Sequence, residues 1–132
     1  MAATPLYILL VSDSHEKVQM AAMVASVAAV SERPVHVFVS MGAMLVFKKD
    51  LDADDRYKGG PFSTVLKDRK APDAMTLFGQ GKMLGEMTMR ACSMALDVLG
   101  WELDDLVDDL FDDTEGLTKF LSDAETGQML TI

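Results

Sequence analysis

The chain has 132 residues, 49% of them hydrophobic and 25% charged, which suits one folded domain with a hydrophobic core and excludes intrinsic disorder. Its formal net charge is −9 and it shows no basic patch, so nucleic acids and acidic lipid surfaces are disfavoured as partners. A lone cysteine, the lack of a signal-peptide pattern and the lack of a long apolar run predict a cytoplasmic protein without a transmembrane segment.

The first predicted element is a strand buried on both faces, because Leu6–Val11 is a continuous apolar run. A helix should follow, capped by Asp13 or Ser14. From Met20 to Val30 this helix is apolar over nearly its whole surface. Such a helix is covered on both sides, so we expect part of it to contact another subunit.

The second predicted strand, Val35–Val39, completes a β-α-β unit with a right-handed crossover. A short apolar helix then ends at Lys48 and Lys49. The polar stretch 50–72 contains Gly59-Gly60-Pro61 and many charges, which is typical of a long, mobile loop. Loops of this kind often act as lids or binding loops.

A third helix is predicted over 73–84, and Gly85 should end it in the left-handed conformation. Residues 86–91 form the third predicted strand, which leads directly to Cys92. The helix after Cys92 should end at Gly100. A Schellman motif there would place Trp101 against Leu96.

The last third of the chain is harder to interpret. Alternating polarity over 106–111 favours a short strand, although a helix also fits. A final helix beginning near 114–116 and a closing strand, "QMLTI", complete the chain; the expected inner face of that helix is Leu117, Phe120, Leu121 and Ala124. The whole predicts an α/β fold, a three-layer α/β/α sandwich with a five-stranded, mainly parallel sheet in one domain of residues 1–132.

Small polar or sulfur-bearing residues follow three of the predicted strands. In an open α/β sheet, ligands bind in the crevice outside the carboxyl ends of the strands. We therefore expect these residues to meet at one edge of the sheet. They are Ser12, Ser14, His15, Ser40, Met41, Gly42, Cys92 and Ser93.

Cys92 is the candidate catalytic residue at this edge. The amino end of a helix favours a thiolate over a thiol, and the thiolate is the nucleophile. Strand alternation places the positive charge of Arg90 on the same face. The sequence leaves open a second interpretation, in which Cys92 is a small core residue packed with Leu96 and Leu99.

The two histidines have weaker claims to a functional role. His15 would suit a proton shuttle or a general base for Cys92, but the sequence favours a solvent-facing residue in the first helical turn. His36 alternates with valines in a buried strand and is expected to be structural.

No metal or dinucleotide site is expected. "DLDADD" lacks the glycine and glutamate of a calcium loop, and "GQGKMLG" has the wrong spacing for a dinucleotide fingerprint.

Two compositional features bear on partners. The acidic run is interpreted as a solvated face, with a docking surface for a basic partner as the alternative; it comprises Asp104, Asp105, Asp108, Asp109, Asp112 and Asp113. Eleven methionines are either adaptable core filling or part of a pliable binding surface near the strand ends, where Met41, Met44, Met89 and Met94 lie.

Four passages resemble the DsrE/DsrF-like family, in particular its peroxiredoxin-like, DsrE-type sulfur carrier branch. They are "LYILLVSDSHEKVQMAAMVASVAAV", "VHVFVSMGAMLVFKK", "ACSMALDVLGWELDDLVDDL" and "GLTKFLSDAETGQMLTI". The third is the most specific, with a cysteine, a methionine two residues on, and Leu-Gly before an acidic "DDLV". Residues 50–72 are the least matched part.

The resemblance implies an α/β/α fold, homo-oligomers and, for several members, sulfur transfer through a persulfide. In those members a cysteine receives sulfane sulfur from a rhodanese-like or TusA-like protein and passes it on, and this role falls on Cys92. Some relatives have a second cysteine. This chain has only Cys92, so a two-cysteine relay is impossible here. Other members lack transfer activity, and membership alone does not establish function.

The leading hypothesis is a cytoplasmic sulfur carrier or sulfurtransferase-type protein that needs no metal or organic cofactor. A partner protein would dock near Cys92, gated by residues 50–72. The alternatives are a non-catalytic oligomeric binding module and a one-cysteine thiol redox sensor.

Overall fold

The computed structural model describes residues 3–132, and its strands alternate with helices along the chain. The amino-terminal half contains β1 (Leu6–Leu10), α1 (His15–Val30), β2 (Val35–Val39), α2 (Ala43–Val46), α3 (Ala53–Arg56) and α4 (Pro61–Asp68). The carboxyl-terminal half contains α5 (Ala74–Leu84), β3 (Met87–Cys92), α6 (Ser93–Leu99), a 3-10 turn (Leu103–Asp105), β4 (Asp113–Glu115), α7 (Leu117–Ala124) and β5 (Gln128–Thr131). No helix within residues 3–132 combines the length and the apolar character needed to cross a membrane.

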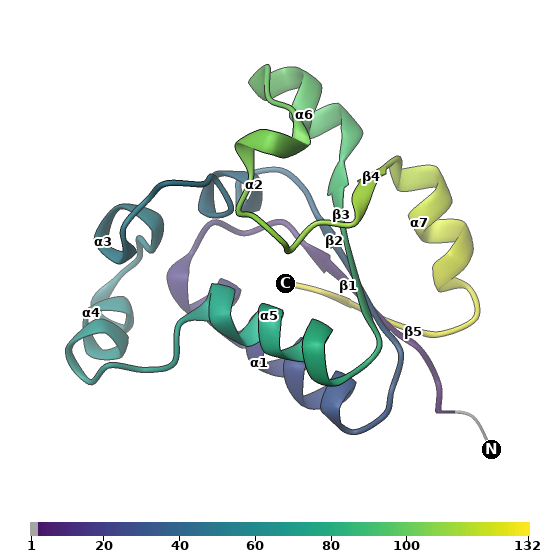
Figure 1. Cartoon of the computed structure of the whole chain (residues 1–132), viewed down its shortest axis with the longest axis horizontal. Coiled ribbons are helices and arrows are strands. Elements are labelled where there is room, and N and C mark those ends of the chain that lie inside the picture. The colour runs from purple at the N-terminus through teal and green to yellow at the C-terminus, as the bar shows by residue number, and fades with distance from the viewer. Residues whose placement is uncertain (1–2) are drawn as a thin grey trace.

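The five strands form one sheet in the order β4-β3-β2-β1-β5, and every neighbouring pair is parallel. The predicted α/β fold with a five-stranded sheet is therefore confirmed, and the sheet is parallel throughout. Because all strands point the same way, their carboxyl ends lie at one edge. That edge carries α2 and α6 (Figure 1).

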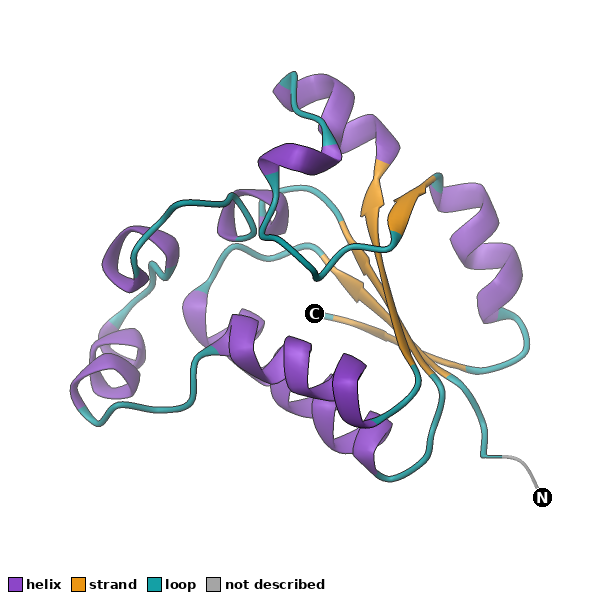
Figure 2. Cartoon of the chain, in the orientation of Figure 1, coloured by secondary structure: helices purple, strands orange, loops and turns teal. Residues whose placement is uncertain are grey.

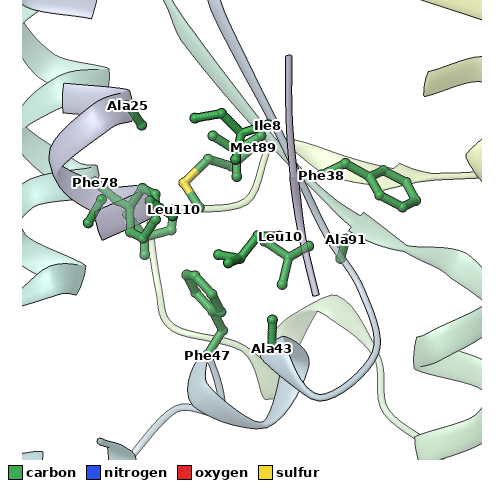
Figure 3. Close-up of a cluster of buried hydrophobic side chains, with 14 of the residues drawn as sticks. Ile8, Leu10, Ala25, Phe38, Ala43, Phe47, Phe78, Met89, Ala91 and Leu110 are labelled. Carbon is green, nitrogen blue, oxygen red and sulfur yellow. The ribbon is translucent and has the colours of Figure 1, made fainter. Parts of the chain in front are cut away.

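Helices cover the two faces of the sheet unequally. Helices α1 and α5 pack against each other on one face, while α7 lies on the other (Figures 1 and 2). The core under α1 and α5 joins Ile8, Met89 and Phe78 (Figure 3). On the α7 face, Phe38 and Tyr7 pack against Phe120, with ring centroids 4.9 and 5.8 Å apart.

Small residues let α1 and α5 approach closely. A side chain at Gly85 would collide with the Ala29 carbonyl of α1, and a Cβ at Gly81 would lie only 3.2 Å from the Ser26 Cα of α1 and would collide with the Met87 side chain. The prediction that Gly85 is left-handed is wrong, since its φ is −145°. Glycine is required there by the closeness of the Ala29 backbone and not by the turn.

The opposite stripe of α1 is exposed in the chain. Met20, Met23, Val27 and Val30 lie along it, between 44 and 65% exposed. The helix thus buries one apolar face against the domain and leaves a second apolar face uncovered.

The prediction of a long loop at 50–72 is wrong, because the segment contains two helices. It contains α3 and α4, and the Arg56 guanidinium donates hydrogen bonds to the carbonyls of Val46, Lys48 and Leu51 at 2.7, 2.7 and 3.1 Å. Asp52 caps α3, and Tyr57 is buried. These polar residues therefore anchor the segment, although composition alone suggested a loop.

The prediction for 106–111 is also wrong, because these residues form neither a strand nor a helix. Leu106 and Leu110 are buried from a loop. The edge strand β4 begins later, after Asp112 has exchanged two hydrogen bonds with Met89. The Asp112 N–H donates to the Met89 carbonyl, and the Asp112 carboxylate accepts from the Met89 N–H, both at 2.8 Å.

Helices α6 and α7 agree only in part with the predictions from the sequence. Gly100 ends α6 with φ 70°, and the Trp101 N–H donates to the Leu96 carbonyl at 3.0 Å, which confirms the Schellman motif. In α7, Phe120 and Ala124 are buried as expected, but Leu117 and Leu121 are 47% and 42% exposed. That helix covers the sheet with a narrower stripe than its composition indicated.

Candidate functional site

The carboxyl edge of the sheet brings together the ends of β1, β2 and β3, as the sequence predicted. Neighbouring parallel strands hold the three ends in register, with Leu10 opposite Val39 and Val39 opposite Ala91. Asp13 after β1 packs against Gly42 after β2, since a Cβ added to Gly42 would lie 3.4 Å from the Asp13 Cβ. The predicted residues nevertheless divide into two groups.

The first group surrounds Cys92, the last residue of β3 and the N-cap residue of α6. Its side chain makes no capping hydrogen bond, and the residue is buried, with 4% of its surface exposed. Ser93, the next residue, is exposed. The thiol therefore lies at the predicted strand-to-helix junction but just beneath the surface.

The edge strand β4 is the nearest neighbour of Cys92 in the sheet. Only three residue pairs join β4 to β3, and the last of them sets Cys92 opposite Glu115. Glu115 is buried, and its Oε1 accepts from Arg90 Nη1 at 3.3 Å and lies 3.5 Å from Lys119 Nζ. The Arg90 charge expected to assist Cys92 is therefore paired with a carboxylate that the sequence did not single out.

Two cavities flank this junction. One of about 470 Å³ is lined by Arg90, Ser93, Glu115 and Lys119, among others. The other, of about 410 Å³, is lined by Ser93, Asp97, Trp101 and Glu102, among others. Ser93 and Thr114 line both cavities, whereas Cys92 lines neither.

A third hollow lies between α2 and α6 and is mostly apolar. It has a volume of about 350 Å³, and its lining includes Met41, Gly42, Leu45, Met94 and Val98. Met41 and Gly42, predicted as site residues, are thus brought next to the helix that begins after Cys92. Met44 and Met89, by contrast, are fully buried in the core.

The second group, around His15, faces a different part of the molecule. The His15 ring stacks on Tyr57 with centroids 4.5 Å apart, and its Nδ1 is hydrogen-bonded to Ser63 Oγ at 2.7 Å. His15 is therefore buried, and the expectation of a solvent-facing residue is wrong. The structure gives His15 no contact with Cys92, because these bonds commit the ring to the segment that carries α3 and α4.

The serines near β1 and β2 have local structural roles. Ser12 Oγ accepts the Ser14 N–H at 3.1 Å, which shapes the turn before α1. Ser14 precedes α1 as its N-cap residue, without a side-chain cap. Ser40 is buried, and its N–H donates to the Leu10 carbonyl at 2.9 Å.

Burial dominates the electrostatics of both histidines. It lowers the pKa of His15 below its ordinary value, and the nearby Lys67 lowers it further. The pKa of His36 is lowered by burial and then by Arg90. His36 stacks on Tyr7 at 4.6 Å and is hydrogen-bonded to Thr88 at 2.7 Å, which supports the structural role expected for it.

The acidic run lies mostly on the surface. Asp112 is also exposed but is held by an ion pair, since its Oδ2 accepts from Lys82 Nζ at 2.7 Å. Burial opposes ionisation of this carboxyl, but the bonds from Lys82 and Met89 outweigh it and lower the pKa. Among residues 3–132, no three His, Cys, Asp or Glu side chains are grouped so as to hold a metal ion.

Sequence reasoning missed Glu115, Tyr57 and Ser63. Glu115 was expected at the start of a helix, and nothing in a three-residue strand distinguishes it from a turn. Tyr57 and Ser63 lie far from His15 in the chain, and their contacts depend on how the segment 50–72 folds back. No signal in the sequence of that segment indicates these contacts.

Comparisons with known proteins add support for the fold. No family model matches the chain, and no curated protein matches it. A solved structure of a protein of unknown function, MTH1491 from Methanobacterium thermoautotrophicum, is similar, with a TM-score of 0.63 and 15% sequence identity over 98% of this chain and 99% of that one. At this identity the likeness concerns the fold alone.

Proposed function

We propose that the protein is a DsrE-like persulfide carrier of the cytoplasm, in which Cys92 receives a sulfur atom from a donor and passes it to a partner protein. The observation that carries the proposal is the place of Cys92 at the carboxyl end of β3, next to the edge strand β4 and on the side of the sheet where ligands of parallel α/β folds bind. The passage around Cys92 is also the most specific part of the resemblance to the DsrE/DsrF-like family.

The transfer would conserve electrons. The Cys92 thiol loses its proton to solvent, and the thiolate attacks the outer sulfur of a persulfide on the donor. A bond forms between Cys92 Sγ and that sulfur, while the sulfur–sulfur bond of the donor breaks and the donor leaves as a thiolate. Delivery to an acceptor thiolate is the same displacement in reverse, so no metal, oxidant or reductant is needed.

The buried thiol must be uncovered for this exchange. The segment best suited to move is β4, because it is an edge strand joined to the sheet by three residue pairs only. Its displacement would remove Glu115 from the position opposite Cys92 and join the two cavities that Ser93 and Thr114 line. This gate replaces the segment 50–72, which contacts His15 instead.

We further propose that the protein assembles as a homo-oligomer through α1. The stripe of Met20, Met23, Val27 and Val30 is apolar and exposed, and burial of such a stripe is favourable. A rhodanese-like or TusA-like donor would then approach the carboxyl edge of each subunit.

Intact mass spectrometry tests the carrier. After incubation with inorganic polysulfide and removal of excess reagent, the native chain should gain one sulfur atom, and the gain should disappear with dithiothreitol. Cys92→Ser should gain none, while Ser93→Ala serves as the matched control and should still load. If no adduct forms on the native chain under any donor concentration, the carrier proposal is wrong.

A second candidate is a non-catalytic oligomeric binding module. The burial of Cys92 favours it, because a thiol with 4% exposure is also what a core cysteine shows. This candidate predicts an oligomer that survives Cys92→Ser unchanged and a thiol that reacts only when the chain unfolds.

A further inference from the structure

The hollow between α2 and α6 is bordered by two apolar rows. Met94 and Val98 lie four residues apart on α6, and Met41 and Leu45 lie four residues apart at α2. All four side chains are about half exposed or more, and Val98 is 77% exposed. Met94 and Val98 share one face of α6, since residues four apart on a helix do so, and they form one side of a short apolar groove. Met41, in the turn before α2, and Leu45 of α2 line the other side.

Met41 is held in a conformation that its residue type disfavours. Its φ is 51°, in the left-handed region, although it carries a side chain and is 53% exposed. Strained backbone of this kind gathers at ligand clamps and functional turns. Here it sets a flexible methionine at the mouth of the groove, and methionine surfaces adapt well to apolar partners.

The surroundings of the groove are acidic. Nine Asp and Glu residues and no Lys, Arg or His lie between Arg90 and Lys119 in the sequence. Asp97, Glu102 and Asp104 line the cavity on the other flank of α6, and Asp13 packs against Gly42 at the far side of the groove. On the α2 side, Lys48 and Lys49 follow the helix, and Lys48 Nζ lies 5.5 Å from the centre of the Trp101 ring.

From these observations we infer that the groove between α2 and α6 binds an amphipathic helix of a partner protein, one with an apolar stripe flanked by Lys or Arg. An apolar stripe would enter between the two rows, and its basic flanks would meet the carboxylates on both sides. A second copy of this chain fits poorly, because α1, the helix with an exposed apolar stripe, has Lys17 as its only Lys or Arg and so lacks the basic flanks. An anionic membrane is disfavoured for the same reason.

The inference rests on the proposed function in one respect, because it gives Cys92 its exchange partner. Met94 is two residues from Cys92, so a helix in the groove would lie beside the strand-to-helix junction. It would hold a partner at the carboxyl edge of the sheet, across α6 from the cavities that displacement of β4 would open.

A binding experiment with a synthetic peptide tests the groove. The probe is a fluorescein-labelled helical peptide of about 18 residues with a leucine stripe and lysine flanks, and the control probe carries glutamate in place of lysine. Fluorescence anisotropy should show binding of the lysine peptide to the native chain, weaker binding at high salt, and no binding of the glutamate peptide.

Variants on the two sides of the groove localise the binding. Leu45→Glu and Val98→Glu should each weaken it by about tenfold or more, while Met83→Glu, at a site on α5 that is 78% exposed, should leave it unchanged. Equal weakening by Met83→Glu, unchanged binding in both groove variants, or no binding of the lysine peptide would overturn the inference. Circular dichroism of both groove variants confirms that each remains folded, and each on its own decides the outcome.

The two proposals fail separately. Cys92→Ser should still bind the peptide, and Val98→Glu should still take up sulfur from polysulfide. If the native chain binds the peptide but never takes up sulfur, the groove proposal stands and the carrier proposal is wrong. If it takes up sulfur but does not bind the peptide, the carrier proposal stands and the groove proposal is wrong.

Discussion

Replacement of Glu115 by alanine should make the Cys92 thiol more accessible. Glu115 lies opposite Cys92 in the β3–β4 pair, is buried, and holds Arg90 at 3.3 Å. Removing the carboxylate therefore weakens the contacts of β4 while leaving the thiol itself in place. If β4 is the gate, the change lowers the free energy of opening.

The magnitude follows from the exposure of Arg90. Breaking a fully buried ion pair costs about 3–5 kcal/mol, because the remaining charge is left without a partner. The Arg90 side chain is 31% exposed, so water solvates part of its charge and we expect about 1–2 kcal/mol. That corresponds to roughly 5–30-fold faster labelling when labelling proceeds through the open state.

The assay is the rate at which an excess of N-ethylmaleimide modifies Cys92 in the native protein. Asp123→Ala removes the other carboxylate bound to Lys119, which lies on the surface of α7, and should change the rate little. Gly85→Ala destabilises the α1–α5 side without touching β4 and controls for a general loss of stability. A Glu115→Ala rate no faster than that of Asp123→Ala would refute the assignment of β4 as the gate.

Three further predictions concern the fold and its assembly. Gly85→Ala should lower the free energy of unfolding by about 1–3 kcal/mol, because the added Cβ would collide with the Ala29 carbonyl. The control Gly60→Ala places its Cβ near no other atom and should be nearly neutral. Both are measured by urea unfolding, and equal effects would contradict the close packing of α1 and α5. The unfolding free energy should fall as the pH drops below 6.5, since burial lowers the pKa of His15 and His36 in the folded state and the unfolded state then binds protons first; an NMR titration in which His15 titrates at or above 6.5 would contradict this. Val27→Asp should reduce the mass measured by light scattering after size exclusion, because it places a charge in the exposed stripe of α1, while Met83→Asp on α5 should not; an unchanged mass would count against the α1 interface.

The sequence predicted best the elements whose pattern is local. The buried runs at β1 and β2, the Gly100 terminator of α6 and the position of Cys92 at a strand end all depend on neighbouring residues, and the structure confirms them. The meeting of the carboxyl ends of β1, β2 and β3 at one edge of the sheet then followed from the parallel arrangement of the strands.

Features that depend on contacts between distant segments could not be predicted. The segment 50–72 looked like a loop because its polar residues gave no sign that Arg56 would bind three carbonyls or that Tyr57 would stack on His15. The strand β4 begins directly after Asp112, which is hydrogen-bonded to Met89, 23 residues away in the chain. Glu115, opposite Cys92, likewise belongs to a strand that the sequence did not reveal.

The most direct test of the account is the urea dependence of Cys92 labelling under native conditions. Opening of β4 exposes little surface, so the labelling rate should be nearly independent of urea at low concentrations and well above the rate set by global unfolding. If the rate instead rises from zero urea with the full slope of global unfolding, the sulfur is reached only in the unfolded chain, and Cys92 cannot exchange sulfur with a partner.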